Sequence, residues 1–540
     1  MKRKQFNSGI QPYTGTFGKA EVLHLLRRTM FGATKADVTY FMTKTLAQSV
    51  AELLTVPITA PAPPLKNYSS LYTTGGVTTD IEPSLAAGQT WVNTPTIGTL
   101  SGQRRNSLRA WWMSQMINQN RNILEKMTLF WHHLVPVQFE SIGDPVNAYN
   151  YTAVLRANAL GNYKTLIRNV TTEAGMLVYL NGYKNTKTAP DENYGRELQE
   201  LFTVGKDLAV HYTEDDVKTA AKVLTGWRYA NSTNAVTFDV TKHDNTNKTF
   251  SSFYNNTVIT GQSDPNAGAT ELDAMLTMIF AQPEVAKYIC RRLYRFFVYY
   301  DIDATIEAQV ITPLADVFRQ SGYNISTVMS TLLQSQHFFD VMQEGCVIKS
   351  PADFVVNYLR QLTLQFPAST DLPTQYYMWY QMWSYCYAMQ QAIGDPPNVA
   401  GWAAYYQVPS YHETWINADT LRNRKGGSDG LLAAGITKSG FKLIVDPFLW
   451  AAQMDDPSDV NALIAETCEL MHTLPVSATV KQSLKSGLLA GQTSDYYWTN
   501  AYNDATNPSS PNYATYRPIV KNLLLQFLSQ TMNLAEYQLS

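Results

Sequence analysis

The pattern of hydrophobic and polar positions predicts α-helices along most of the chain. Near the start, apolar residues recur at helical spacing from Val22 to Met30, and the pattern ends at Gly32. Further on, Thr213 with Asp216 three residues later is typical of a capped helix start. The same helical spacing recurs over residues 108–119, 123–135, 149–160, 163–170, 269–281, 283–300, 305–321, 325–335, 351–364 and 375–393.

Two stretches depart from this pattern. Residues 56–100 are rich in Pro, Gly and Thr and have no periodicity, so we expect a long surface loop. Residues 228–262 alternate apolar with polar positions and contain Asn-rich turns, which is typical of a β-hairpin or a small sheet. We therefore predict a mainly α protein: an N-terminal arm (1–18), a large multi-helix core domain (19–425) with the β-hairpin insertion, and a helical C-terminal extension (426–540).

Composition and charge narrow the class of protein. The 42 basic and 44 acidic residues give a net charge of −2, which argues against a nucleic-acid binder because such proteins carry a basic excess. The chain has no run of 18 apolar residues, so we expect no membrane-spanning segment. No apolar segment follows the basic N-terminus, so we expect a cytoplasmic protein. The alternative is an envelope or secreted protein whose leader is missing from this sequence.

The cysteines suggest no metal or disulfide scaffold. Cys290, Cys346, Cys386 and Cys468 form no CxxC pair. We expect buried free thiols, with two disulfides among them as the alternative.

One segment, ENYGRELQELFTVG (192–205), is unusually dense in charge for a chain with 16% charged residues. At about 100° per residue its apolar side chains share one helical face, whereas Glu192, Arg196 and Glu200 lie on the opposite side with Glu197 beside them. One interpretation is an amphipathic helix with salt bridges on its outer face. The other is a carboxylate-rich wall of a functional cleft.

Several motifs, taken together, resemble a known family. In chain order they are LLRRTMFGAT, EKMTLFWHH, LRANALGNYKTL, ENYGRELQELFTVG, YTEDDVKTAAKVLTGW, KHDNTNK, KSPADFVVNYLR and DPPNVAGW. This combination resembles the bacterial family called domain of unknown function 1800, from about residue 20 to about residue 425. The resemblance implies a large helical bacterial protein, often exported and frequently encoded beside a sulfatase-like protein. It implies no established activity, so no catalytic residue carries over.

A first hypothesis for the site is one divalent metal ion. Histidine with carboxylates is a ligand set for zinc, manganese or iron, and the His-Asp pair of KHDNTNK lies in a polar turn. The alternative is a hydrogen-bond network that ties the predicted hairpin to the helices. The candidate residues are His132, His133, Glu197, Glu200, His243 and Asp244, with His132, His243 and Asp244 as the metal ligands.

A second hypothesis is acid–base chemistry without metal. Glu192, Glu197 and Glu200 could supply a carboxylate pair for glycoside cleavage. Carboxylates on a single helix rarely straddle a bond, however, and Arg196 beside them would lower their pKa values, which disfavours a general acid.

Arginines and aromatic rings suggest a binding site. Arg27, Arg28, Arg109 and Arg196 could bind an anionic group, or they could be structural partners of the glutamates at 197 and 200. The aromatic residues could stack on sugars, or they could hold a loop against the helical body. These aromatic residues are Trp227, Trp402, Trp415, Tyr405, Tyr406 and Tyr411.

Two functions follow as expectations. The first is a hydrolase-like enzyme, metal-assisted if the ligands converge, that acts on carbohydrate or another envelope polymer. Glu197, Glu200, His132 and Asp244 would be its catalytic residues. The second is a non-catalytic binding or assembly protein that holds a carbohydrate or protein partner with the aromatic loop and the C-terminal extension.

Overall fold

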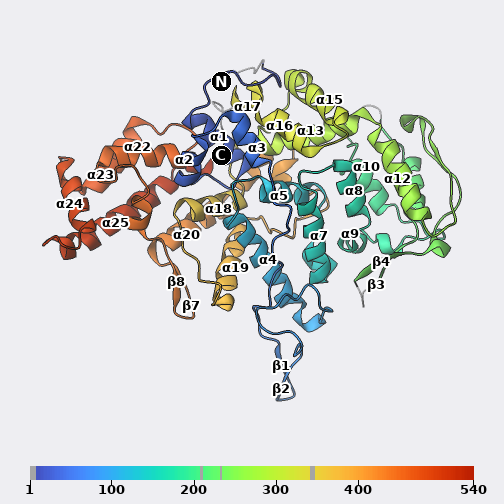
Figure 1. Cartoon of the computed structure of the whole chain (residues 1–540), viewed down its shortest axis with the longest axis horizontal. Helices are drawn as coiled ribbons and strands as arrows, with labels where there is room; N and C mark the ends of the chain where they lie inside the picture. Colours follow the sequence, from blue (N-terminus) through green and yellow to red (C-terminus); the bar gives the residue numbers. More distant parts are fainter. Residues whose placement is uncertain (1–7, 207–210, 231–233, 341–346) are drawn as a thin grey trace.

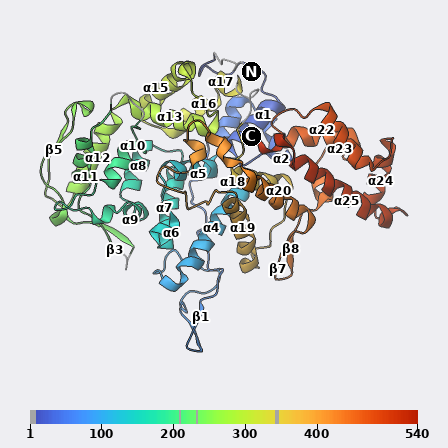
Figure 2. The same ribbon diagram turned by 180° about the vertical axis from the view of Figure 1, so that it is seen from behind.

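The structure is a computed structural model that describes residues 8–206, 211–230, 234–340 and 347–540. Helices dominate it, so the prediction of a mainly α fold is confirmed. The C-terminal helices α22–α25 lie at one end of the molecule, α8–α12 lie at the other, and α1, α5 and α18 lie between them (Figure 1). The reverse view shows the same arrangement (Figure 2).

The central part is built from helices that are distant in sequence. They are α1 (Lys19–Thr29), α2 (Lys35–Phe41), α3 (Leu46–Leu53), α4 (Ser101–Ile117), α5 (Leu124–Leu134), α18 (Pro351–Gln361), α19 (Leu372–Ala388) and α20 (Ala418–Ala433).

The chain between α5 and α18 forms α6 (Phe139–Ile142), α7 (Pro145–Ala157), α8 (Tyr163–Thr171), α9 (Ala174–Tyr179), α10 (Asn193–Glu200), α11 (Glu214–Val223), α12 (Ala267–Phe280), α13 (Pro283–Phe297), α14 (Ala304–Ile306), α15 (Thr312–Gln320), α16 (Ile325–Leu333) and α17 (Gln336–Asp340). The C-terminal extension adds α21 (Pro447–Ala451), α22 (Val460–Met471), α23 (Ala478–Leu489), α24 (Tyr496–Thr506) and α25 (Tyr513–Met532).

The strands pair into small antiparallel hairpins. The predicted β structure near 228–262 is confirmed, because two hairpins lie there; the other two interrupt segments predicted as loop and as helix. The pairs are β1 (Leu71–Thr74) with β2 (Val77–Asp80), β3 (Trp227–Ala230) with β4 (Ala235–Phe238), β5 (Lys248–Thr249) with β6 (Val258–Ile259), and β7 (Ile436–Lys438) with β8 (Phe441–Leu443).

Local side-chain signals define the helix ends near the site. The side chain of Thr213 accepts the backbone N–H of Asp216, and Asp216 bonds back to Thr213, so α11 begins with the predicted capping box. Gly226 has φ +95° just beyond α11, a conformation that glycine adopts without strain. Ser350 caps α18, with a proline in its first turn.

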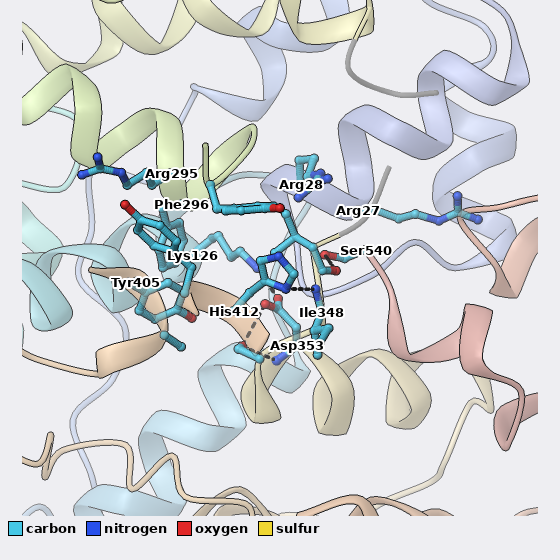
Figure 3. A pocket seen from close by; sticks show the side chains of 15 residues that line it. Arg27, Arg28, Lys126, Arg295, Phe296, Ile348, Asp353, Tyr405, His412 and Ser540 are labelled. Carbon is cyan, nitrogen blue, oxygen red and sulfur yellow. Dashed lines mark hydrogen bonds and ion pairs between the residues drawn. The ribbon is translucent and has the colours of Figure 1, made fainter. Parts of the chain in front are cut away.

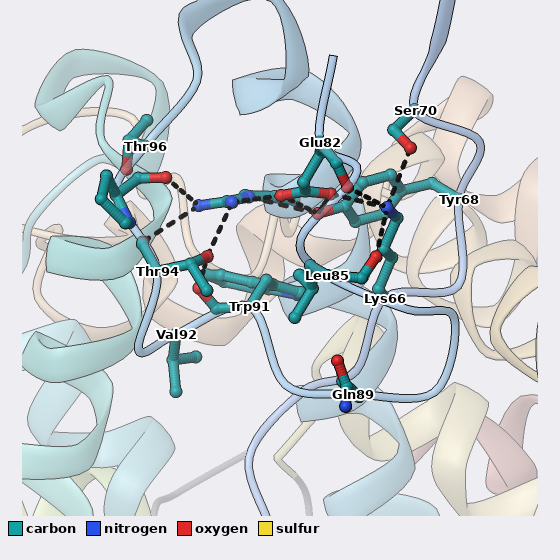
Figure 4. Close-up of polar contacts among 12 residues, drawn as sticks. Lys66, Tyr68, Ser70, Glu82, Leu85, Gln89, Trp91, Val92, Thr94 and Thr96 are labelled. Atoms are coloured by element: carbon teal, nitrogen blue, oxygen red, sulfur yellow. Dashed lines mark hydrogen bonds and ion pairs between the residues drawn. The ribbon is translucent and has the colours of Figure 1, made fainter. Parts of the chain in front are cut away.

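The segment 56–100 has a polar interior as well as an exposed surface (Figure 4). Its buried Glu82 pairs with Arg104 of α4 and with Lys66 (3.1 Å). The indole of Trp91 is also buried and donates a hydrogen bond to Ser107 (3.1 Å). The expected loop is therefore anchored to α4 by buried charge, while its β1–β2 hairpin projects into solvent (Figure 1).

The extension and the core share one continuous cluster of buried hydrophobic side chains. The last residues also return to the core, where the backbone of Lys349 donates to the carbonyl of Gln538 and that of Ser540 donates to the carbonyl of Val347, both at 2.8 Å. Tyr537 is fully buried beside them.

The cysteines and the helices can be compared with the sequence predictions of free thiols and of no membrane-spanning segment. Cys290, Cys386 and Cys468 are free and buried, as predicted, and Cys346 lies outside the described residues. Among the described helices, none combines the length and hydrophobicity needed to cross a bilayer.

Candidate functional site

The charged segment forms helix α10, with Tyr194 and Leu198 buried on its inner face. On the outer side, Arg196 donates to both carboxylate oxygens of Glu214 (2.9 and 2.7 Å) and pairs with Glu192 (3.2 Å). The predicted salt-bridged outer face is thus confirmed.

The two candidate catalytic carboxylates of α10 have different surroundings. Glu200 pairs with Lys206 (2.9 Å). Glu197 is half-buried and makes no ion pair or side-chain hydrogen bond with any described residue. Burial, and then the negative charge of Glu200, raises the pKa of Glu197. The expected lowering by Arg196 is outweighed, because that guanidinium is bound to Glu214.

The C-terminal end of α10 borders a cavity of about 430 Å³, which we call the arginine cavity. A cavity of this size falls within the range typical of small-molecule sites. Its walls are the end of α10, one face of α13 and residues 400–408. The polar residues that line it are Glu200, Lys206, Glu284, Tyr288, Arg291, Arg292, Arg295, Glu307 and Tyr406.

Helix α13 supplies most of these polar groups because of their spacing. Tyr288, Arg291, Arg292 and Arg295 occur at i, i+3, i+4 and i+7, so they share one face of the helix. The opposite face carries residues such as Leu293 and is buried. One helix therefore packs into the core and presents three guanidinium groups to the cavity.

Most of the charges around the cavity are already paired. Arg291 bonds both oxygens of Glu307 (2.9 and 2.7 Å) and one oxygen of Glu284 (2.5 Å). Lys206 pairs with Glu200. These contacts neutralise most of the polar lining and fix the positions of its side chains.

The loop at residues 400–408 is held against α5 by His133. The backbone N–H of Trp402 donates to Nδ1 of His133 (3.1 Å). Gly401 has φ +83° and lies so close to the ring that a Cβ atom would be 2.2 Å from Nδ1. This close approach places Tyr406 at the cavity wall.

Arg292 differs from Arg291 in that it has no ion pair with any described residue. Its Nη2 atom lies 3.1 Å from Nε2 of His133, and its guanidinium lies 5.9 Å from the ring centroids of both Tyr288 and Tyr406. Burial and Arg292 hold the pKa of His133 well below its ordinary value, so the ring is neutral. A neutral imidazole has one acceptor nitrogen, and the N–H of Trp402 already uses Nδ1. Arg292 therefore keeps donor capacity and uncompensated charge beside the cavity.

His132, the first predicted metal ligand, is fully buried among aromatic rings. Trp112 and Trp402 are the nearest of these rings, with centroids at 5.1 and 5.6 Å. Neither ring nitrogen has a hydrogen-bond partner in the described structure, and burial lowers the pKa of His132 to about 3. The residue is a neutral part of the core.

The other two predicted ligands belong to a different, buried network. His243 contacts Glu271 through Nε2 (3.1 Å), and Glu271 also accepts hydrogen bonds from Lys248 (2.6 Å) and the backbone N–H of Gln262 (2.8 Å). Asp244 accepts from Thr246. Within the described ranges, no group of three or more His, Cys, Asp or Glu side chains is arranged to hold a metal ion. The contacts fit the alternative, a network that ties the hairpin β5–β6 to α12.

The remaining candidate arginines do not pair with Glu197 or Glu200, so that structural prediction is wrong. Arg109 bonds Glu140 (2.7 Å) and Asp395 (2.6 Å). Arg27 donates to the carbonyls that end α22, and Arg28 is buried near the centre of the molecule. Partner choice depends on helix packing that is not visible in the sequence.

The predicted aromatic residues are mostly internal. Trp402 and Trp415 are buried, with 2% and 4% of their surface exposed, so neither offers an open ring face to a sugar. Trp227 packs against Phe238 in the β3–β4 hairpin. Of the predicted aromatic residues, Tyr406 alone lines the arginine cavity.

Arg292 and Tyr288 were not among the sequence candidates. A signal for Arg292 exists in CRRLYRFF (290–297), where three arginines interrupt an apolar helix. The sequence cannot show that this face meets α10 and residues 400–408, because the three segments are far apart in the chain.

Comparison with known proteins identifies the family alone. No curated protein and no solved structure matches the chain. The sequence model of one family matches residues 24–539, which extends the resemblance across the C-terminal extension. The chain therefore belongs to the family described as protein of unknown function (DUF1800).

Proposed function

We propose that this chain is a binding protein whose arginine cavity holds an anionic ligand. The supporting observation is Arg292, a half-buried cation with no acidic partner in the described structure, beside a cavity of about 430 Å³. A guanidinium in this position binds a carboxylate or phosphate group through charge-assisted hydrogen bonds.

A carboxylate-bearing sugar is the ligand class that fits best. Tyr288 and Tyr406 flank Arg292, and tyrosine rings pack against the apolar faces of sugar rings. The ion pairs of Arg291 with Glu284 and Glu307 add fixed polar groups that can meet hydroxyls. The ligand would thus be anchored by Arg292 and oriented by the surrounding hydroxyl and carboxylate groups.

Isothermal titration of the full chain with galacturonate, with galactose as the neutral comparison, tests the proposal. We expect galacturonate to bind and galactose to bind much more weakly. Arg292→Met should weaken galacturonate binding about 10- to 100-fold, the range expected for losing a charged hydrogen bond.

The matched control is Arg168→Met, which removes an exposed arginine that pairs with Asp273 outside the cavity. It should leave the affinity unchanged. Equal affinities of wild type and Arg292→Met would contradict the proposal, as would the absence of binding by any acidic sugar.

The hydrolase expectation is a second candidate, and the raised pKa of Glu197 favours it. A general acid must be protonated near neutral pH, and burial raises the pKa of this carboxyl group. Glu200, three residues further on, borders the cavity. If the ligand is a polymer, this pair could act on a bond at the cavity's edge.

Release of reducing ends from polygalacturonate tests this second candidate. Glu197→Gln should lower any activity about 10²- to 10⁴-fold, the usual effect of removing a general acid. Asp215→Asn removes an exposed carboxylate of α11 and should have no effect. If wild type binds the sugar and releases no reducing ends, the chain is a binding protein only.

A further inference from the structure

The ring of His133, on α5, lies between the loop at residues 400–408 and the guanidinium of Arg292. The backbone N–H of Trp402 points at Nδ1 and an N–H of Arg292 points at Nε2, both at 3.1 Å. The ring is neutral, because burial and the charge of Arg292 hold the pKa of His133 well below its ordinary value. A neutral imidazole accepts at one nitrogen and carries the proton on the other. The two donors therefore compete for a single acceptor.

Two arrangements of this group of residues follow from the competition. In one, Nδ1 of His133 accepts from the loop and the protonated Nε2 faces Arg292. In the other, Nε2 accepts from Arg292 and the protonated Nδ1 faces the N–H of Trp402. The bond from Arg292 is charge-assisted and therefore the stronger of the two, whereas a buried backbone N–H is unfavourable when it is left unpaired. Among the described residues, neither Arg292 nor the Trp402 N–H has a second hydrogen-bond acceptor.

The loop has another anchor, which does not depend on the nitrogens of His133. Tyr405 packs against Phe296 of α13 with ring centroids 4.8 Å apart, and Figure 3 shows these two rings side by side. The change between the two arrangements is therefore small and centred on residues 401–402. These residues lead directly to Tyr406 at the wall of the arginine cavity.

We propose that Arg292 and the loop compete for His133, which makes His133 a positioning residue for the ligand site. An anion that binds Arg292 leaves Nδ1 of His133 to the loop, and the loop then holds Tyr406 against the ligand. The coupling rests on the proposed function, because its trigger is an anion at Arg292.

The carboxylate pairs of other arginines indicate how the anion acts. Each of them uses Nη2 together with a second nitrogen, and Nη2 is the atom of Arg292 that contacts His133. A ligand carboxylate bound in the same way engages this atom and draws the guanidinium toward the cavity. The arginines that bind carboxylates in this way are Arg156, Arg168, Arg196 and Arg291.

Hydrogen exchange of the Trp402 amide measures the competition in the full chain. Glycine precedes tryptophan only at 401–402 and 226–227, so glycine labelled with carbon-13 and tryptophan labelled with nitrogen-15 single out two amides by NMR. Trp227 lies in β3 and is the internal reference. Without ligand, Arg292→Met should slow exchange at Trp402 about 2- to 10-fold, the range expected for one hydrogen bond, and leave Trp227 unchanged. Equal exchange at Trp402 in wild type and Arg292→Met would overturn the proposal.

The response to galacturonate tests the coupling itself. A saturating concentration should slow exchange at Trp402 in wild type. In His133→Asn the asparagine oxygen takes the place of Nδ1 and nothing replaces Nε2, so exchange should be slow already and should not respond to the ligand. Because coupling is reciprocal, this variant should bind galacturonate at least as tightly as wild type. Weaker binding together with faster exchange would show that His133 has a merely structural role.

Failure of the coupling can be distinguished from failure of the proposed function. If no acidic sugar binds while Arg292→Met slows exchange at Trp402, the binding proposal is wrong and the competition for His133 is confirmed. If galacturonate binds and exchange at Trp402 is the same with and without it, the coupling is wrong and the binding stands. Arg168→Met is the matched control and should change neither amide. If His133→Asn does not fold, the comparison of wild type with Arg292→Met still decides.

Discussion

Glu173 shows how burial changes the chemistry of one residue. Its carboxylate caps α9 by accepting the N–H groups of Gly175 (2.5 Å) and Met176 (3.3 Å). Hydrogen bonds to a helix N-terminus favour the charged form, yet burial outweighs them and raises the pKa of Glu173 to about 8. The folded protein therefore holds a proton that the unfolded chain releases.

This proton gives the first prediction, a loss of stability as pH rises. The folded pKa of Glu173 is about 8 and the ordinary value is 4.5. Its stabilising contribution is complete below the unfolded value and is lost as pH rises through the folded value. Between pH 5 and pH 8, wild type should lose about 1.4 kcal/mol per pH unit relative to Glu173→Gln, which never ionises. Urea unfolding at four pH values measures this difference, and parallel stability profiles of the two proteins would contradict it.

Partner choice at single residues is where the sequence is least informative. Arg196 is one helical turn from Glu192 and Glu200, and a local rule predicts bonds to both. The guanidinium does bond Glu192 (3.2 Å), but its closer bonds go to Glu214 at the start of α11. That contact depends on how α10 packs against α11, and helical periodicity carries no information about it.

At the scale of elements, the segment 56–100 is held by buried charge. Glu82 lies between Lys66 and Arg104, and all three side chains are at most 5% exposed. Removing one member of a buried ion pair typically costs about 3–5 kcal/mol, because the partner charge remains buried.

The second prediction is that Glu82→Ala lowers the free energy of unfolding by about 3–5 kcal/mol. The matched control, Asp215→Ala, breaks the exposed pair with Lys218 and should change stability by less than about 1 kcal/mol. Chemical denaturation measures both changes. Similar small effects in the two variants would show that the buried charges do not anchor the segment.

Elements with strong local signals were predictable. The helix starts at Thr213 and Asn324 follow from their capping side chains, because a cap needs only its own neighbours. Hairpins β1–β2 and β7–β8 were missed, although Gly75–Gly76 and Ser439–Gly440 both have positive φ, a feature of two-residue hairpin turns. Strands of three or four residues are too short to stand out from an irregular background.

The residues that line the arginine cavity were only partly predictable from the sequence. The sequence indicated Glu200 and Tyr406 as candidates, and both line the cavity. The sequence did not indicate Arg292. This residue is notable because it lies beside His133, Tyr288 and Tyr406 and has no acidic partner among the described residues. These neighbours of Arg292 belong to segments that are far apart in the chain, so only the folded structure shows that they meet.

At the scale of the molecule, the C-terminal extension is integrated with the core. Tyr537 is fully buried and packs on Phe354 of α18, with ring centroids 5.8 Å apart. The Nζ of Lys349 donates to the carbonyl of Tyr537 (2.6 Å). Arg424, on the core side of residue 425, contacts Gln538 (3.3 Å).

The third prediction is therefore that residues 1–425 alone do not form a stable fold. Removing 426–540 would cut α20 after residue 425 and expose the apolar surface of α18. It would also take the carbonyl of Tyr537 from Lys349 and the side-chain oxygen of Gln538 from Arg424. Exposure of apolar surface and unmet buried donors are both unfavourable. We expect aggregation or a broad, low-temperature unfolding transition by circular dichroism. Replacing the exposed hairpin 71–80 with a short Gly-Ser linker is the control and should leave the transition nearly unchanged, because each of its strands is exposed. A sharp transition in the truncated chain, close to that of the full chain, would show instead that the core folds independently and that the extension is an added domain.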